Sequence, residues 1–193
     1  MPLTQFEKET LLKIARSSIE AFVRDNAALE VDIPSPTLFE DAGAFVSIHK
    51  GGRLRGCIGT FASPEPLYIT VRDMAVAACS RDPRFVPVEE CELDNICIEI
   101  SVLSPLREIT DISEIEVGRH GLFITKERWR GVLLPQVAVE YGFDREKFLE
   151  ETCLKAGLET CDWKEGAKIF VFEAEIIKED GGDRAHPKKS PAQ

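Results

Sequence analysis

A run of glycines around one cysteine constrains the fold of this chain more than any other feature. Residues 51–60 read GGRLRGCIGT, with a thiol between two glycines and two residues from an arginine. Such a stretch could be a phosphate-binding loop, a site with a nucleophilic cysteine, or a tight hairpin. The lysine of a P-loop does not follow Gly56, and no Gly-x-Gly-x-x-Gly pattern is present. The phosphate-loop interpretation therefore fails and the hairpin remains.

Two adjacent glycines, Gly51 and Gly52, predict the loop of a β-hairpin. Type I′ turns need a positive φ at both central positions, and glycine adopts that conformation without steric cost. The sequence before the loop is rich in β-branched and aromatic residues. We therefore expect strands over 43–49 and 53–60.

The hairpin also predicts where side chains of its return strand point. With a two-residue loop, Val46 should lie opposite Cys57, and Arg55 should share the face of Cys57 because side chains alternate. Gly56 and Gly59 remove bulk on either side of the cysteine. Glycine inside a strand usually marks a bulge or the close approach of a backbone or a ligand. We expect Arg55 to favour the Cys57 thiolate, which is the reactive form of cysteine.

Composition excludes several classes of protein. The 193 residues suit one domain or two small lobes with a shared core, and 44% apolar residues is typical of a folded chain. A net charge of −10 disfavours a large nucleic-acid or anionic-membrane footprint. No secretory signal or membrane-spanning apolar run is visible, so we expect a cytoplasmic protein with six reduced cysteines.

Local charge around the hairpin differs from this acidic average. Residues 50–84 carry six basic and three acidic side chains, which gives +3 and leaves −13 for the rest of the chain. A basic island in an acidic protein suits a small anion, such as a carboxylate or a phosphate, better than a polymer.

Hydrophobic spacing predicts an α+β fold with a mainly antiparallel sheet and flanking helices. Thr4 and Glu7 form a capping box for the first helix. The expected helices run from Thr4 to about residue 28 and over 65–80 and 145–156, and the further strands cover 95–103, 121–126, 131–134 and 168–177. These strands are linked by hairpins and do not alternate regularly with helices, which favours α+β. The polar residues 181–193 are expected to form a flexible tail.

No metal or cofactor motif is apparent. The sequence has no Cys-x-x-Cys pair, and its three histidines stand far apart. His120 could act as a base for Cys57, but nothing in the spacing brings the two together and a surface histidine is the default interpretation. His49, opposite Leu54, is expected on the face away from Cys57.

Five motifs give the chain a family resemblance. They are LRGCIGT (54–60), DPRF (82–85), EISVLSP (99–105), GVLLPQV (131–137) and ETCLKAGL (151–158). Together, in this order, they resemble the AMMECR domain family, also called AmmeMemoRadiSam system protein A, over nearly the whole chain.

The resemblance implies an α+β fold and a set of candidate residues. The expected domain covers 1–180 and has two unequal lobes with a cleft between them, the larger lobe coming from both chain ends. A functional link to a Memo-type protein and a radical S-adenosylmethionine protein is also implied. The motif residues that the family offers as candidates for binding or catalysis are Arg55, Gly56, Cys57, Gly59, Arg84, Gln136 and Cys153.

Roles for these residues follow from their chemistry. Cys57 is the candidate nucleophile or attachment site, with Arg55 as an anion clamp. Cys153 falls on one apolar helical face, which favours core packing. Gln136 could place its amide at a chain turn or cap a short helix. Glu99 points away from the apolar face of its strand, where it could line a cleft or be solvated.

Two functions of different classes remain open. The first is an enzyme, or an enzyme subunit, that acts on a small anionic substrate through Cys57. The alternative is a non-catalytic module that holds a peptide or a nucleotide for partner enzymes. A cysteine buried in a glycine-rich hairpin for packing alone is the structural alternative to both.

Overall fold

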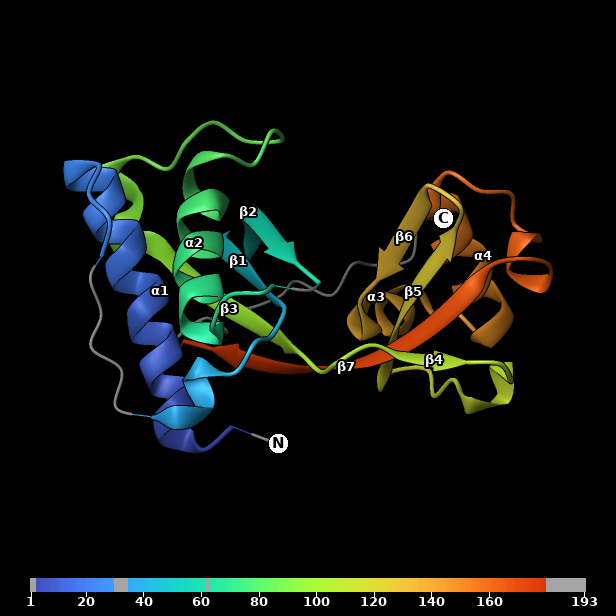
Figure 1. Ribbon diagram of the computed structural model, residues 1–193. Coiled ribbons are helices and arrows are strands. Elements are labelled where there is room, and N and C mark those ends of the chain that lie inside the picture. Colours follow the sequence, from blue (N-terminus) through green and yellow to red (C-terminus); the bar gives the residue numbers. More distant parts are fainter. Residues whose placement is uncertain (1–2, 30–34, 62, 180–193) are drawn as a thin grey trace. The chain divides into compact units, whose positions relative to one another are not determined.

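A computed structural model describes residues 3–29, 35–61 and 63–179 (Figure 1). The tail predicted over 181–193 lies outside the described residues. The chain divides into two compact units, the first formed by Met1–Val102 with Ile176–Gln193 and the second by Leu103–Glu175. The cleft expected between two lobes stays a prediction.

The fold class predicted from the sequence, α+β with an antiparallel sheet, is confirmed. The helices are α1 (Gln5–Asp25), α2 (Leu67–Ser80), α3 (Pro135–Tyr141) and α4 (Arg145–Ala156), with short 3-10 turns η1 (Pro36–Phe39), η2 (Glu90–Asn95), η3 (Ile112–Glu114) and η4 (Asp162–Lys164). The strands are β1 (Ala44–Lys50), β2 (Arg53–Thr60), β3 (Ile96–Leu103), β4 (Arg107–Ile109), β5 (His120–Lys126), β6 (Trp129–Leu133) and β7 (Lys168–Lys178). The strand order is β2-β1-β3-β7-β5-β6, with β4 paired to β7. Strand β2 is therefore an edge strand.

In the first unit, α1 and α2 lie side by side and α2 packs on β1 and β2 (Figure 1). Alternate residues of β1 point toward these helices, and Val46 and Ile48 are completely buried. In the described part of this unit, no α-helix covers the other face of β1, β2 and β3 (Figure 1). The described part of the chain contains no helix with the length and apolar composition needed to cross a membrane.

Helix α1 has the predicted start but an earlier end. The Thr4 hydroxyl accepts a hydrogen bond from the Glu7 backbone N–H at 3.3 Å, and the Glu7 carboxylate accepts one from the Thr4 backbone N–H at 2.7 Å. The helix ends at Asp25 because Asn26 adopts the left-handed conformation, with a φ of 51°. The expected end near residue 28 was therefore too late.

Helix α2 starts later than its sequence predicts. The helix was expected to begin at residue 65, but the Ser63 hydroxyl accepts the Glu65 N–H, at 3.1 Å, in a local turn. The helix begins at Leu67 after Pro66, without a side-chain cap. The side-chain hydrogen bond of Ser63 thus forms a local turn where the first helical turn was predicted.

In the second unit, α4 packs on β5 and β6. Its start and end are as predicted, because the Asp144 carboxylate accepts the Lys147 N–H at 2.8 Å and Gly157 has a φ of 79°. The β5–β6 turn is shorter than expected. It comprises residues 127–128 only, while Trp129 already belongs to β6.

The glycine hairpin forms as predicted, and it contains a bulge that the predicted register did not include, although a glycine inside a strand is one of the signs of a bulge. Gly51 and Gly52 form the loop with φ values of 57° and 73°. Beyond the loop the register shifts, so that Gly56 pairs with Ile48 and Arg55 is the extra residue.

The bulge changes which residues surround the cysteine. Ser47, not Val46, lies opposite Cys57. Because side chains alternate along β1, Ser47 and His49 share one face, and Cys57 lies on that face with them. The expectation that His49 lies on the face away from Cys57 was therefore wrong. One inserted residue reverses every later assignment of faces along a strand.

Candidate functional site

Cys57 is half-buried on β2, with its side chain on the sheet face opposite α1 and α2. Its sulfur accepts a hydrogen bond from the Ser47 hydroxyl, with an O···S distance of 3.2 Å. Glu99 of β3 pairs with Ser47 in register, which places its carboxylate on the same face. Glu99 Oε2 lies 2.9 Å from Lys178 Nζ. The face therefore presents a thiol, a hydroxyl and an ion pair in one row.

Side chains from the segment after α2 bind the backbone of Cys57. The buried Asp82 carboxylate accepts the Cys57 N–H at 2.8 Å. Arg84 Nη2 donates to the Cys57 carbonyl oxygen at 3.2 Å. These two side chains satisfy the outward backbone groups of an edge strand, where a further strand would otherwise pair.

Asp82 and Arg84 also bind each other. Arg84 donates to the carboxylate through Nε at 2.9 Å, through Nη2 at 2.7 Å and through its backbone N–H at 3.1 Å. The Arg84 hydrogen bond holds the pKa of Asp82 well below its ordinary value, although burial opposes this shift. The pair is therefore ionised at neutral pH.

Arg84 is the guanidinium that contacts Cys57, at its backbone carbonyl oxygen. Its pKa is raised chiefly by the hydrogen bond with Asp82, and charge and hydrogen-bond interactions with the Cys57 side chain add to the rise. The Arg84 side chain is 56% exposed. No partner for its Nη1 is found among residues 3–29, 35–61 and 63–179, so this group can contact a ligand.

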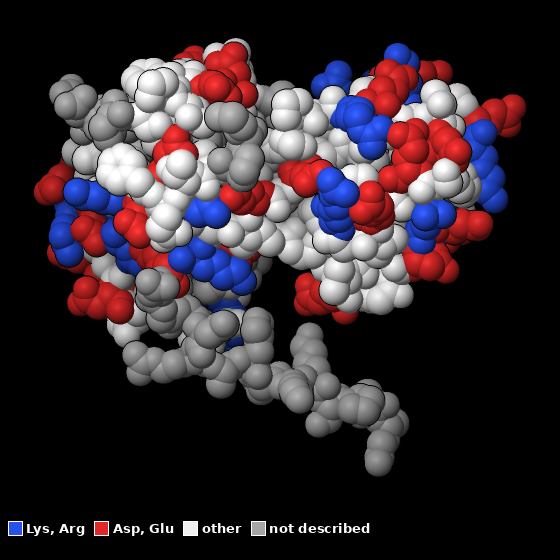
Figure 2. All heavy atoms as spheres, turned by 90° about the horizontal axis from the view of Figure 1, so that it is seen from below, with Lys and Arg blue, Asp and Glu red and all other residues white. Residues whose placement is uncertain are grey.

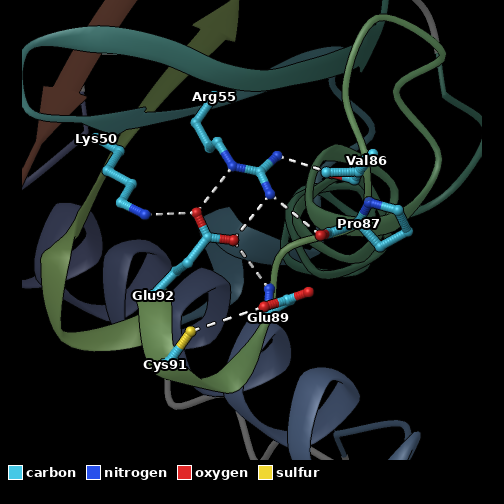
Figure 3. A network of polar contacts seen from close by, with 7 residues as sticks. All are labelled: Lys50, Arg55, Val86, Pro87, Glu89, Cys91 and Glu92. Carbon is cyan, nitrogen blue, oxygen red and sulfur yellow. Dashed lines mark hydrogen bonds and ion pairs between the residues drawn. The ribbon is translucent and has the colours of Figure 1, made fainter.

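Arg55 faces a different set of groups, as Figure 3 shows. Its guanidinium donates to both oxygens of Glu92, from Nε at 3.1 Å and from Nη2 at 2.8 Å. It donates further to the carbonyls of Val86 at 2.8 Å and Pro87 at 3.1 Å. The structure does not bring the Arg55 guanidinium and the Cys57 thiol together, because the bulge at position 55 separates their directions.

Close packing explains why positions 56 and 59, near Cys57, are glycines. A Cβ on Gly56 would overlap the backbone carbonyl oxygen of Ala78 in α2, and one on Gly59 would overlap the ring of Phe45. The predicted close approach of another backbone therefore occurs at Gly56. A ligand-binding role for either glycine stays a prediction.

The remaining candidates lie in the second unit, whereas Cys57 lies in the first. Cys153 is completely buried in the core, and burial raises the pKa of its thiol. Gln136 lies in the first turn of α3, and its buried Oε1 has no hydrogen-bond partner among the described residues. His120 is buried, with Nδ1 accepting the Glu116 N–H at 3.1 Å, so the expectation of a surface histidine was wrong.

The basic island is largely neutralised by local partners. Its ion pairs are Lys50 and Arg55 with Glu92, Arg72 with Asp73, and Arg84 with Asp82. Basic and acidic side chains are intermingled on the face that Figure 2 shows. In the described part of the chain, no cluster of three or more His, Cys, Asp or Glu side chains could hold a metal ion.

Sequence reasoning missed the groups that surround the thiol most closely. Asp82 was not among the predicted site residues, and its burial under Arg84 has no signal in hydrophobic periodicity. Val46 was predicted opposite Cys57, and His49 on the other face, because the predicted register contained no bulge. The glycine at 56, inside a strand, was the available signal for that bulge.

Comparisons with known proteins agree on one family. The AMMECR1 family model matches residues 12–177. A protein from Methanosarcina barkeri is 41% identical over 92% of both chains, and one from Methanothermobacter thermautotrophicus is 42% identical over 93% of this chain and 98% of its own. The crystal structure of an uncharacterized protein from Pyrococcus horikoshii superposes with a TM-score of 0.86 at 38% identity, covering 92% of this chain and 94% of that one.

Proposed function

The chain belongs to the AMMECR1 family, and on that premise we propose that the sheet face around Cys57 binds a small anionic substrate which the thiol attacks. One observation carries the proposal: the sulfur accepts a hydrogen bond from the Ser47 hydroxyl, and the Arg84 guanidinium binds the backbone carbonyl of the same cysteine. A hydroxyl donor and a guanidinium at one cysteine suit the binding of an anionic group beside that sulfur.

The chemistry assigns one role to each group. The sulfur of Cys57 forms a bond to an electrophilic atom of the substrate, its proton passes to solvent, and the leaving group departs with its bonding electrons. Ser47 stabilises the negative sulfur by its hydrogen bond. Arg84 binds the anionic part of the substrate through Nη1, while Asp82 holds the guanidinium in place.

Alkylation rates test the nucleophile. Cys91 and Cys161 are exposed, whereas Cys57 and Cys97 are both half-buried, and the register of β3 places Cys97 on the same sheet face as Cys57. Cys97 is therefore the matched control. We expect iodoacetamide at neutral pH to label Cys57 about tenfold faster than Cys97, and at least as fast as the exposed cysteines, because a sulfur activated as a nucleophile reacts faster than its exposure alone would allow. Peptide mass spectrometry over a time course measures each rate, and rates that follow exposure alone would contradict the proposal.

A binding module without chemistry is the second candidate. The exposed guanidinium of Arg84 favours it, because Nη1 needs no thiol to bind a carboxylate or a phosphate. Native mass spectrometry of ligands that co-purify with the protein separates the two functions. Capture that persists in Cys57→Ser and is lost in Arg84→Ala supports binding alone, whereas an adduct on Cys57 supports the nucleophile.

Protein partners belong to the same proposal. Family resemblance supports a Memo-type protein and a radical S-adenosylmethionine protein as partners, and the cytoplasm as their shared compartment. Affinity capture with each purified candidate, with and without Arg84→Ala, tests the link. If the protein binds neither candidate, the proposal of these partners is wrong, whereas the proposed role of Cys57 is not affected.

A further inference from the structure

The buried contacts of Arg55 point to a role at a distance from the substrate. Its side chain is 14% exposed and that of Glu92 11% exposed, and the two meet through a pair of parallel hydrogen bonds (Figure 3). Glu92 also accepts hydrogen bonds from Lys50 Nζ at 2.8 Å and from the Glu89 N–H at 3.0 Å. A carboxylate with this many donors forms a rigid anchor.

Arg55 uses this anchor to hold a segment that has little structure of its own. Residues 81–89, between α2 and η2, contain no helix or strand. Arg55 donates to two carbonyls of this segment, those of Val86 and Pro87. Segments without regular structure depend on such contacts for a fixed position.

The same segment binds Cys57 at its other end. Asp82 and Arg84 accept from and donate to the backbone of Cys57, two residues along β2 from Arg55. The segment is therefore fastened to one strand at two places. Release of the Arg55 contacts would leave the Cys57 contacts as the only hydrogen bonds described between this segment and β2.

We propose that Arg55 and Glu92 form a clamp that positions the Arg84 guanidinium beside the Cys57 thiol. Arg55 is then a positioning residue and Arg84 the group that meets the anion. This inference rests on the proposed function of Cys57. It differs from a direct anion-binding role for Arg55, because four hydrogen bonds from that guanidinium go to Glu92, Val86 and Pro87.

Glu92→Gln discriminates between the two roles of Arg55. An amide has no charge and one acceptor oxygen in place of two, so the clamp loosens. If Arg55 bound the anion directly, loss of its competing carboxylate would leave anion binding unchanged or stronger. If Arg55 positions Arg84, the same substitution weakens the attraction of the Arg84 guanidinium for an anion at the Cys57 thiol.

The ratio of Cys57 alkylation rates with iodoacetate and with iodoacetamide reports the positive charge beside the thiol. We expect Arg84→Ala to lower this ratio about fivefold. That is the expected effect of removing one positive charge that attracts the anionic reagent through a partly aqueous medium. Arg55→Ala and Glu92→Gln should lower it by a similar factor. Arg53→Ala is the matched control, because Arg53 is exposed in the same hairpin and no side-chain partner for it is found among the described residues, so the ratio should stay unchanged.

Amide hydrogen exchange gives a second readout. The Cys57 N–H is bound by Asp82, so Arg55→Ala and Glu92→Gln should speed its exchange while the buried N–H of Ile100 in β3 keeps its rate. Equal acceleration at both amides would indicate general unfolding and would overturn the clamp. An unchanged ratio in Glu92→Gln would overturn it too. A wild-type ratio equal to that of Arg84→Ala would instead refute the anion site. The exchange rate of the Cys57 N–H would then be the remaining test of the clamp.

Discussion

Glu92 shows at the scale of one residue how the local network determines charge. The Arg55 hydrogen bond, and after it that of Lys50, lowers the pKa of Glu92 from 4.5 to about 2, against an opposing effect of burial. A carboxyl group whose pKa is lower in the folded state stabilises the fold above its unfolded pKa. That contribution is lost as the pH falls through the folded value.

This shift predicts a pH-dependent loss of stability in wild type that Glu92→Gln lacks. Between pH 5 and pH 2 the free energy of unfolding of wild type should fall by about 3 kcal/mol more than that of the variant, because the shift spans about two and a half pKa units. Urea denaturation at a series of pH values measures the difference. Plots of the free energy of unfolding against pH that run parallel over this range would contradict the network. The pKa of Glu7 is also lowered to about 2, but Glu7 is present in both proteins, so its contribution cancels in the difference.

At the same scale, the sequence identified the cysteine but not its neighbours. Gly51-Gly52 and the alternation around them were enough to place Cys57 on the second strand of a hairpin. They could not place Arg84, whose position depends on a buried carboxylate from a segment without periodicity. Contacts made by irregular segments depend on tertiary packing, which a one-dimensional pattern does not encode.

At the scale of elements, the approach of α2 to β2 depends on one missing side chain. The backbone of α2 at Ala78 lies where a Cβ on Gly56 would be. Gly51 differs, because its φ is 57° but no atom lies within 4 Å of its would-be Cβ. The two glycines therefore serve different purposes, close packing in one case and turn conformation in the other.

Alanine at each position should separate these purposes. Gly56→Ala must displace α2 or β2, and we expect a cost of about 3 kcal/mol or more in the free energy of unfolding. Gly51→Ala should cost about 1 kcal/mol, because only the left-handed conformation is penalised. Thermal and urea unfolding of both variants tests the order, and equal losses would contradict it.

The elements themselves were largely predictable, and their ends and register were not. Capping signals predicted the start of α1 at Thr4 and both ends of α4, because each depends on residues within one turn. The bulge at Arg55 depends on a longer-range cause, since it turns Gly56 to the sheet face on which α2 packs and Cys57 to the opposite face. Local pattern cannot predict which residue a strand will insert for that purpose.

At the scale of the whole molecule, two hydrophobic cores share no residue. The first gathers α1, α2 and β1–β3 around buried residues such as Ile19 and Ile48, and the second gathers α4, β5 and part of β7 around Phe148 and Leu122. The first unit takes residues from both chain ends, whereas the second is one continuous stretch. Separate cores allow local opening of one unit with a free energy below that of global unfolding.

Removal of one large core side chain should therefore act within its own unit. Phe148 is completely buried, and Phe148→Ala should cost about 3–5 kcal/mol through lost burial and a cavity. In native-state hydrogen exchange, amides of β5 should lose protection by that amount while those of α1 keep theirs. Ile19→Ala, a truncation in the first core, is the matched control and should give the reverse pattern. Equal losses in α1 and β5 from either substitution would mean that the two cores unfold together, because a shared transition removes protection everywhere at once.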